Sequence, residues 1–316
     1  MESGAVIMEK PADLPPVCDY ENSDYQSSFW EEGGRSYEDQ AEAIALKHFL
    51  PPGGGWLLEI GAGAGRNTPR YAAFERVVLL DYSLTQLQQA QTRLGIDAQA
   101  DPFGRYIFVA ANVYRLPFHA AAFEAATMIR VLHHLADPAL ALRQIWRALA
   151  ADGIFVLEFA NKQNIKAIIR YLLRRQTWNP FDNDAVEFVH LNFDFHPQAL
   201  RKWLIESGFS IMHMRTVSHF RLDFLKRIVP LGILVKLDAL LQPSGDIIQL
   251  SPSVFVQASA IGSASAHPSV VTAQDLFCCP ACGGKRLEVQ GRESLVCPAC
   301  EAVWTLRNGI YDFRVA

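Results

Sequence analysis

Leu57-Leu58-Glu59-Ile60-Gly61-Ala62-Gly63-Ala64-Gly65-Arg66 is the stretch that decides the fold of this chain. It is an apolar run that ends in a glycine-rich turn, with an acid, Glu59, just before the turn. A second apolar run, residues 77–80, ends at Asp81, twenty residues after Gly61. Such a turn lets the backbone approach a ligand closely, and an acid at the end of the second strand can accept hydrogen bonds from both hydroxyls of a ribose. The pattern predicts a site for a nucleoside cofactor.

Apolar runs alternate with helical patterns outward from this stretch. Continuous apolar strands that alternate with helices are typical of a parallel sheet covered on both faces. We therefore expect an α/β fold with a doubly wound, mostly parallel, Rossmann-like sheet, and a small C-terminal module. The sequence predicts helices at 37–50, 66–74, 83–93, 138–149, 161–175 and 196–208, strands at 56–60, 77–81, 106–110, 124–129, 153–158, 209–216 and 250–258, and an irregular segment at 181–194.

Length and composition limit the classes of function. At 316 residues the chain is long enough for one full domain and a small module. The net charge of -4 argues against the whole molecule acting as a nucleic-acid cation. The N-terminal residues show no basic segment followed by an apolar run, and charges and a proline interrupt the apolar stretch 224–241. We therefore expect a soluble, cytoplasmic protein without a secretory signal or a transmembrane segment.

The spacing of the glycines distinguishes between nucleoside cofactors. The third glycine of a dinucleotide fingerprint, G-x-G-x-x-G, would fall at Arg66. Instead, residues 59–65 and Asp81 resemble the first two motifs of class I S-adenosylmethionine-dependent methyltransferases. The segments 112–118, 130–138 and 149–157 resemble the later motifs of that family in the same order. The resemblance covers about residues 35–260 and is strongest from 56 to 160.

The resemblance implies roles for individual residues. Glu59 would help to hold the cationic ammonium end of S-adenosylmethionine, and Asp81 would take the ribose hydroxyls. Asn112 replaces the usual Asp, and its side-chain oxygen can still accept a hydrogen bond from the adenine amino group. The cofactor-binding set implied in this way is Glu59, Gly61, Ala62, Gly63, Gly65, Asp81, Tyr82, Asn112, Val113 and Arg130.

Candidates for acid–base chemistry are spread over several segments. Methyl transfer from a sulfonium needs a general base only if the acceptor must lose a proton, so a sharp catalytic motif is not required. His133 and His134 lie where the family's loop passes the methyl donor, although local packing explains at least one of them equally well. The segment 186–197 mixes acids and histidines with aromatics and could line an acceptor pocket, although His196 could simply cap the next helix. The catalytic candidates are Tyr37, His133, His134 and His190, with Glu187 and His196 as further residues near the mouth.

A basic stripe follows the fifth predicted strand. Lys162, Lys166, Arg170 and Arg174 recur every four residues, opposite the apolar residues Ile165, Ile168, Ile169, Leu172 and Leu173. Three interpretations remain open: an RNA contact, a contact with an anionic membrane surface, or a solvated helix face. Residues 224–241 could form a lid, which would suit a hydrophobic acceptor.

Two C-x-x-C pairs predict a metal site near the C-terminus. Cys279, Cys282, Cys297 and Cys300 supply four thiolates with the spacing of a closed, structural zinc site, and Cys278 stands outside the pattern. About 40 residues cannot bury enough apolar surface to fold securely alone, so a metal is also physically needed. This module resembles the zinc-ribbon subunit that activates several methyltransferases, fused here to the chain.

We therefore predict a methyltransferase that uses S-adenosylmethionine and a structural Zn²⁺, with a small or lipid-like acceptor. An RNA methyltransferase that docks through the ribbon and the basic helix, and a non-catalytic cofactor-binding scaffold, are the alternatives. Because the ribbon is fused, no obligate partner is expected. The predicted parts are an irregular segment 1–35, a methyltransferase domain 36–260 with its acceptor or lid region at 161–250, a linker 261–274 and a zinc ribbon 275–316.

Overall fold

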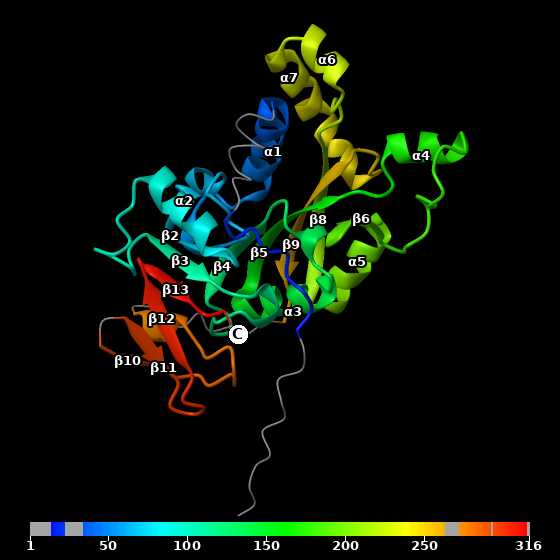
Figure 1. Ribbon diagram of the computed structural model, residues 1–316. Helices are drawn as coiled ribbons and strands as arrows, with labels where there is room; N and C mark the ends of the chain where they lie inside the picture. The colour runs from blue at the N-terminus through cyan, green and yellow to red at the C-terminus, as the bar shows by residue number, and fades with distance from the viewer. Residues whose placement is uncertain (1–13, 23–33, 263–271, 292, 315–316) are drawn as a thin grey trace, which may run out of the picture.

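A single large sheet forms the centre of the molecule. The computed structural model describes residues 14–22, 34–262, 272–291 and 293–314. The sheet has the strand order β10-β11-β12-β13-β3-β2-β1-β4-β5-β9-β8 (Figure 1). The strands β3, β2, β1, β4 and β5 are mutually parallel, whereas β9 is antiparallel to both β5 and β8. Their bounds are β1 Gly54–Ile60, β2 Phe74–Asp81, β3 Tyr106–Ala110, β4 Phe123–Met128, β5 Leu149–Ala160, β8 Phe209–Val217 and β9 Ser253–Ala260.

Helices cover both faces of this sheet, as the alternating pattern predicts. Neighbouring strand residues point to opposite faces, so Leu57 and Leu58 of β1 enter two separate buried clusters. Helices α1 (Ser36–Phe49) and α2 (Leu84–Leu94) pack on the face of Leu57, while α3 (Pro138–Ala148) and α5 (Pro197–Glu206) pack on the face of Leu58. The expected doubly wound α/β fold is confirmed.

Two local predictions are wrong. Residues 66–74 form only a 3₁₀ turn, Thr68–Tyr71, because Pro69 restricts the residue before it and the chain enters β2 at Phe74. The segment 181–194, expected to be irregular, contains a small antiparallel hairpin of β6 (Val186–Val189) and β7 (Asn192–Asp194). Its strands are short and largely exposed, so they lack the buried alternation that marks a strand in a sequence.

The C-terminal strands continue the main sheet. Strand β13 pairs in parallel with β3, in a register that joins Ile310 to Phe108 and Asp312 to Ala110. Phe277 stacks on Phe118 with ring centroids 5.9 Å apart, so the C-terminal module shares the hydrophobic core of the larger domain. Most of the predicted linker, 263–271, lies outside the described residues. The elements of this module are α8 Ala273–Leu276, β10 Glu288–Gln290, β11 Ser294–Val296, β12 Val303–Arg307 and β13 Ile310–Asp312.

Three further helices lie at the carboxyl edge of the parallel strands. Helix α4 (Ile165–Leu172) follows the carboxyl end of β5, and α6 (Asp223–Ile228) and α7 (Leu231–Leu241) follow that of β8, which runs in the same direction as β5. Figure 1 shows α6 and α7 projecting beside α1, and α4 extending outward to the right of that projection. In the part of the chain that the structure describes, no helix is long and apolar enough to cross a membrane.

Candidate cofactor site and metal site

The glycine turn after β1 requires glycine for two reasons. Gly61 has a φ of 65°, a conformation that L side chains rarely adopt. A Cβ atom on Gly61 would lie 2.1 Å from Cγ2 of Val131, which follows β4. The turn therefore packs directly against the neighbouring strand end, and its backbone faces the space above the strand ends.

Asp81 holds the same turn from the end of β2. One carboxylate oxygen accepts a hydrogen bond from Gly63 N at 2.8 Å, and the other accepts one from Ser83 N at 3.0 Å. Burial raises the pKa of Asp81, although these backbone donors oppose the shift. A carboxylate offers about four acceptor positions. Asp81 therefore keeps acceptor capacity for two further hydroxyl groups, as the ribose role requires.

Glu59 lies deeper than the resemblance implies. Its side chain is buried and accepts a hydrogen bond from Thr68 Oγ1 at 2.6 Å. Burial raises the pKa of Glu59 to about 8. At neutral pH the carboxyl group is therefore mostly protonated unless a cation approaches it. A cationic ligand end is the kind of group that would favour its ionised form.

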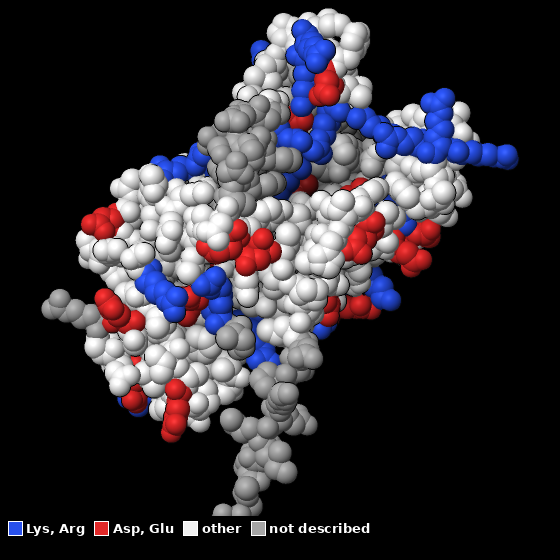
Figure 2. All heavy atoms as spheres, in the orientation of Figure 1, with Lys and Arg blue, Asp and Glu red and all other residues white. Residues whose placement is uncertain are grey.

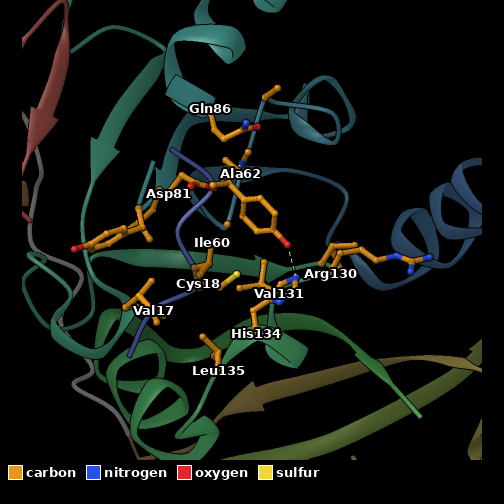
Figure 3. A pocket seen from close by; sticks show the side chains of 18 of the residues that line it. Val17, Cys18, Ile60, Ala62, Asp81, Gln86, Arg130, Val131, His134 and Leu135 are labelled. Atoms are coloured by element: carbon orange, nitrogen blue, oxygen red, sulfur yellow. Dashed lines mark hydrogen bonds between the residues drawn. The ribbon is translucent and has the colours of Figure 1, made fainter. Parts of the chain in front are cut away.

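A pocket opens between the glycine turn, Asp81 and the loop after β4 (Figure 3). The predicted residues Gly61, Ala62, Gly63, Asp81, Tyr82, Val113, Arg130 and His134 line this pocket. Glu59, Gly65 and Asn112 do not line it. The Asn112 side chain instead accepts a hydrogen bond from Tyr114 N at 2.9 Å and caps the 3₁₀ turn Val113–Arg115. Its predicted adenine contact stays a prediction.

One wall of the pocket comes from a segment that sequence reasoning missed. Val17, Cys18 and Tyr20 line the pocket, and Val17 forms a β-bridge with Leu135. Glu21 accepts hydrogen bonds from Leu84 N and Thr85 N at the start of α2. Residues 1–35 were expected to be irregular, and the described part, 14–22, indeed contains no helix. Irregular composition carries no signal of where a segment packs.

Arginines tie the pocket to α1. Arg66, which occupies the position of the missing third glycine, forms ion pairs with Asp39 and Glu42. Arg130 pairs with the same Glu42 from the other side. Burial acts against the charge of Glu42, but the two guanidinium groups hold its pKa below the ordinary value. Arg66 also lines the pocket, so it is a structural cation in the pocket wall.

The two adjacent histidines occupy different environments. His134 Nδ1 lies 2.9 Å from Leu191 O, and its Nε2 lies 3.0 Å from the Tyr20 hydroxyl. Burial lowers the pKa of His134. His133 does not line the pocket, and its buried Nδ1 has no hydrogen-bond partner among the residues that the structure describes. Burial, together with His134 and Arg130, holds the pKa of His133 well below its ordinary value. Both rings are therefore neutral near pH 7.

Two other catalytic candidates lie away from the pocket. The Tyr37 hydroxyl donates to Asp238 at 2.6 Å and accepts from Phe220 N at 2.9 Å, which joins α1 to α7. Burial and the adjacent Asp238 raise the pKa of Tyr37 far above the ordinary value. The side chain of His190 is 85% exposed in the β6–β7 hairpin, 3.9 Å from Glu187. Neither residue lines the pocket.

Charged groups that the sequence did not single out, one buried and two partly buried, lie beside Arg130. Glu158 accepts hydrogen bonds from Arg130 N at 3.1 Å and from Ser253 Oγ at 2.6 Å. Burial and the nearby Glu158 raise the pKa of Asp194 to about 6. Burial also lowers the pKa of Arg221, which interacts with Arg130 and Glu158. These groups come from β5, β7 and the loop between β8 and α6, and their proximity depends on the tertiary fold.

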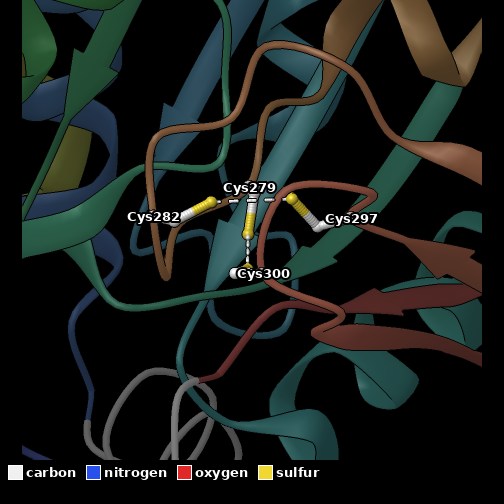
Figure 4. Close-up of side chains that lie close together, drawn as sticks. All are labelled: Cys279, Cys282, Cys297 and Cys300. Atoms are coloured by element: carbon white, nitrogen blue, oxygen red, sulfur yellow. Dashed lines mark hydrogen bonds between the residues drawn. The ribbon is translucent and has the colours of Figure 1, made fainter. Parts of the chain in front are cut away.

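Four cysteines of the C-terminal module converge on one point (Figure 4). The sulfur atoms of Cys279, Cys282, Cys297 and Cys300 all lie within 4.8 Å of one another. Two of the distances are 3.7 Å, between Cys279 and Cys300, and 3.5 Å, between Cys282 and Cys297. A tetrahedral zinc with Zn–S bonds of about 2.3 Å separates its sulfurs by about 3.8 Å. The cluster therefore has the ligand chemistry and the spacing of a structural zinc site.

The neighbours of the cluster support this geometry. A Cβ atom on Gly284 would lie 3.0 Å from the Cys297 sulfur and 3.2 Å from the Cys282 sulfur, so a larger residue would crowd the site. Cys278 is not part of the cluster, as its position in the sequence indicates. Its thiol donates to Phe118 O at 3.1 Å in the core.

Comparisons with known proteins agree with this site. A family model described as a methyltransferase domain matches residues 58–157. An uncharacterised chloroplastic methyltransferase of Arabidopsis thaliana is 30% identical over 121 residues, which cover 37% of this chain and 34% of that protein. A demethylmenaquinone methyltransferase of Clavibacter sepedonicus is 26% identical over 195 residues, 57% of this chain and 76% of that protein. The chain spans only 34% and 39% of the first two curated relatives that it matches.

The fold also has a counterpart among solved structures. A complex of the Haloferax volcanii Trm112 methyltransferase activator with a methyltransferase aligns over 75% of this chain and 96% of that one. The TM-score is 0.52 at 13% identity, which supports the fold alone. Residues 58–157, which include the glycine turn and Asp81, thus form a methyltransferase domain.

Proposed function

We propose that this protein transfers a methyl group from S-adenosylmethionine to a small or lipid-like acceptor. The observation that carries the proposal is the pocket at the carboxyl ends of β1, β2 and β4. It combines the glycine turn at Gly61 with a carboxylate, Asp81, that retains free acceptor capacity. The family match over residues 58–157 supports the same reading.

The residues of the pocket suit the parts of this cofactor. We assign the ribose hydroxyls to Asp81 and the amino-acid end to the backbone of the Gly61–Gly63 turn, with Glu59 as the countercharge beneath it. When bound, the cofactor supplies a methyl group activated by a sulfonium. The apolar lining residues, such as Ile60, Leu80 and Ile129, exclude water from that group.

Relatives and the surroundings of the pocket support the proposed acceptor class. Relatives are named for demethylmenaquinone and for 27-O-demethylrifamycin SV, which are both organic small molecules. His134 lines the pocket with a neutral ring, so it is the candidate base for an acceptor that must lose a proton. His133, Tyr37 and His190 are weaker candidates because they lie outside the lining.

We also propose that the four cysteines bind one structural zinc ion. All four ligand positions are thiolates, so no position remains for a substrate. The metal would stabilise the short strands β10–β13, and through β13 the edge of the main sheet.

An RNA acceptor is the rival proposal, which the exposed basic residues around α4 favour.

Calorimetric titration with S-adenosylmethionine tests the cofactor. We expect one site per chain, and affinity should fall by at least tenfold in Asp81→Ala, because a charge-assisted pair of hydrogen bonds contributes about 1.5–3 kcal/mol. The exposed Asp184→Ala is the matched control and should bind like the wild type. Absence of binding by the wild type, or unchanged binding in Asp81→Ala, would refute the assignment.

A second experiment tests the acceptor. Protein and labelled cofactor are incubated with a cell extract that has been divided into lipid, small-molecule, RNA and protein fractions. The proposal expects label in the lipid or small-molecule fraction. Label confined to RNA would instead establish the rival.

A further inference from the structure

Helix α4 carries an apolar face that the described part of the chain leaves uncovered. An amphipathic helix of a globular protein normally turns its apolar face to the core. In α4 only Ala167 is buried. The large apolar residues of the helix and of its end are exposed by about half or more: Ile165 52%, Ile169 49%, Leu172 69% and Leu173 58%.

The α6–α7 projection has the same property. Helix α7 is anchored to α1 through Leu234 and Val235, which pack on Tyr37. The other sides of α7 are largely exposed, and no residue of α6 is buried. The exposed large apolar residues of this projection are Leu222 44%, Phe224 69%, Ile228 61%, Leu231 38%, Ile233 49%, Leu237 43%, Leu240 76% and Leu241 42%.

Both apolar surfaces belong to the same edge of the molecule. They follow the carboxyl ends of β5 and β8, the edge at which the cofactor pocket also opens. Lys166 of α4 donates a hydrogen bond to Arg221 O at 2.8 Å, just before α6, so the two surfaces are joined at their base. Figure 2 shows a hollow between the α6–α7 projection and α4.

Basic residues flank these apolar residues on α4 and on the projection. Arg170, Arg174 and Arg175 at α4 are exposed, and no acid lies between Ile165 and Arg175. Arg227 and Lys236 are exposed on the projection. Asp238 of α7 is buried, and its carboxylate forms hydrogen bonds with Tyr37 and His219. Asp223 is the other acid of α6 and α7, and it is exposed. In Figure 2 a blue band runs from the projection outward along α4.

One member of the predicted basic stripe does not belong to this surface. Lys162 is buried before α4 begins, and its ammonium group pairs with Asp182 and donates to Asp184 O at 2.6 Å. The stripe therefore starts at Lys166. Basic and apolar residues occupy different faces of α4, as predicted, but the large apolar residues are exposed and do not pack in the core.

We infer that α4 and the α6–α7 projection dock on an anionic phospholipid bilayer, with their apolar residues in the headgroup–acyl boundary and their basic residues on the lipid phosphates. Exposed aliphatic residues flanked by Lys and Arg are the composition that such a surface binds. An RNA surface would use the charges but would leave the aliphatic residues of α4 exposed to water. A twofold dimer through this face would bury the arginines of both copies in one interface, where no exposed acid of α4 is available to pair with them.

The membrane contact would also bring the acceptor to the protein, and this second step rests on the proposed function. A lipid-like acceptor dissolved in the bilayer would reach the hollow between α4 and α6–α7 without passing through water. The membrane contact itself does not depend on catalysis, so the two can fail separately.

Flotation with vesicles tests the contact on the full chain. One set of vesicles contains phosphatidylcholine alone and the other also contains phosphatidylglycerol. We expect binding to the anionic vesicles that weakens as salt rises. Each basic residue near such a surface contributes about fivefold in affinity, so Arg170→Glu/Arg175→Glu should lower binding at least about twentyfold. Ile169→Ser/Leu172→Ser should also abolish most of the binding, since it removes the inserted apolar area.

The matched control is Lys202→Glu/Ile205→Ser on α5, where both residues are also exposed but lie near the amino end of β8. It should bind vesicles like the wild type. No binding of the wild type to anionic vesicles at low salt, or equal binding of all variants, would overturn the inference. If the wild type does not bind vesicles but binds RNA tightly, and Arg170→Glu/Arg175→Glu loses the RNA binding, the inference is overturned in favour of RNA. If the wild type does not bind vesicles but forms a dimer that dissociates in the same variant, the inference is overturned in favour of a dimer.

Calorimetry with S-adenosylmethionine on the same variants separates the two proposals. Cofactor affinity should stay unchanged in all of them, which also shows that they fold. Vesicle binding without cofactor binding by the wild type would retain the membrane contact and reject the proposed function.

Discussion

The Tyr20 hydroxyl lies 3.0 Å from Nε2 of His134, across the mouth of the cofactor pocket. The other ring nitrogen of His134 faces Leu191 O, which can only accept a hydrogen bond. Nδ1 therefore carries the proton, and Nε2 accepts from Tyr20. The residue that is best placed to act as a base is thus oriented by a backbone carbonyl and covered by the N-terminal segment.

This arrangement predicts the state of the His134 ring. Nitrogen NMR at pH 7 should show a neutral ring protonated on Nδ1, because burial lowers its pKa and Leu191 O fixes the tautomer. A ring protonated on Nε2, or a charged ring at this pH, would contradict the geometry.

Replacement of Tyr20 by Phe should weaken cofactor binding about fivefold. The change removes one hydrogen bond, which contributes about 1 kcal/mol, that holds the segment Val17–Tyr20 against the pocket. Calorimetry measures the effect, and Tyr171→Phe on α4 is the control. Equal affinity of Tyr20→Phe and the wild type would mean that this segment does not contribute to the bound state.

Gly61→Ala should destabilise the protein by about 3 kcal/mol or more. Alanine at positive φ costs about 1–2 kcal/mol, and the clash with Val131 adds to this. Gly95 has nearly the same φ, 66°, but has no atom within 4 Å of its Cβ position. Gly95→Ala should therefore cost only about 1 kcal/mol, as measured by denaturant unfolding. Adding Val131→Ala to Gly61→Ala should recover part of the loss, whereas equal costs at both glycines would exclude the clash.

Glu59→Gln should reveal the raised pKa of Glu59. The folded protein holds a proton on Glu59 up to about pH 8, whereas the unfolded chain releases it near pH 4.5. The wild type therefore loses stability relative to Glu59→Gln as pH rises from about 5 to 8, by up to about 5 kcal/mol, and the difference is constant above pH 8. Unfolding at pH 5, 7 and 9 without cofactor measures it. A difference that does not vary with pH would show that Glu59 is ionised throughout.

Cys297→Ser should remove the bound zinc, whereas Cys278→Ser should retain it. Both thiols are buried, but only Cys297 belongs to the four-sulfur cluster. Structural zinc contributes about 10–16 kcal/mol in small peptides, so the midpoint of thermal unfolding should fall clearly in Cys297→Ser. Metal analysis of fresh protein provides the first readout. Full zinc content in Cys297→Ser would refute the ligand set.

The sequence predicted those parts of the structure that local pattern determines. The strand before Gly61, the acid Asp81 at the next strand end and the C-x-x-C pairs are local features. The structure forms both strands, and the sulfur atoms of the two C-x-x-C pairs converge on each other. Contacts between distant segments were not predictable. Nothing near Tyr20 indicates that it meets His134, which is 114 residues away. Tyr37 carried no sign that its hydroxyl would be used by Asp238.

The pairing of β13 with β3 also affects how the protein responds to concentration. An exposed edge strand is open to pairing with other chains, and here β13, from the same chain, occupies that edge of β3. The pairing is unimolecular, so dilution does not dissociate it, whereas a ribbon on a separate chain would leave at low concentration. The C-terminal module and the larger domain are therefore always present in a one-to-one ratio.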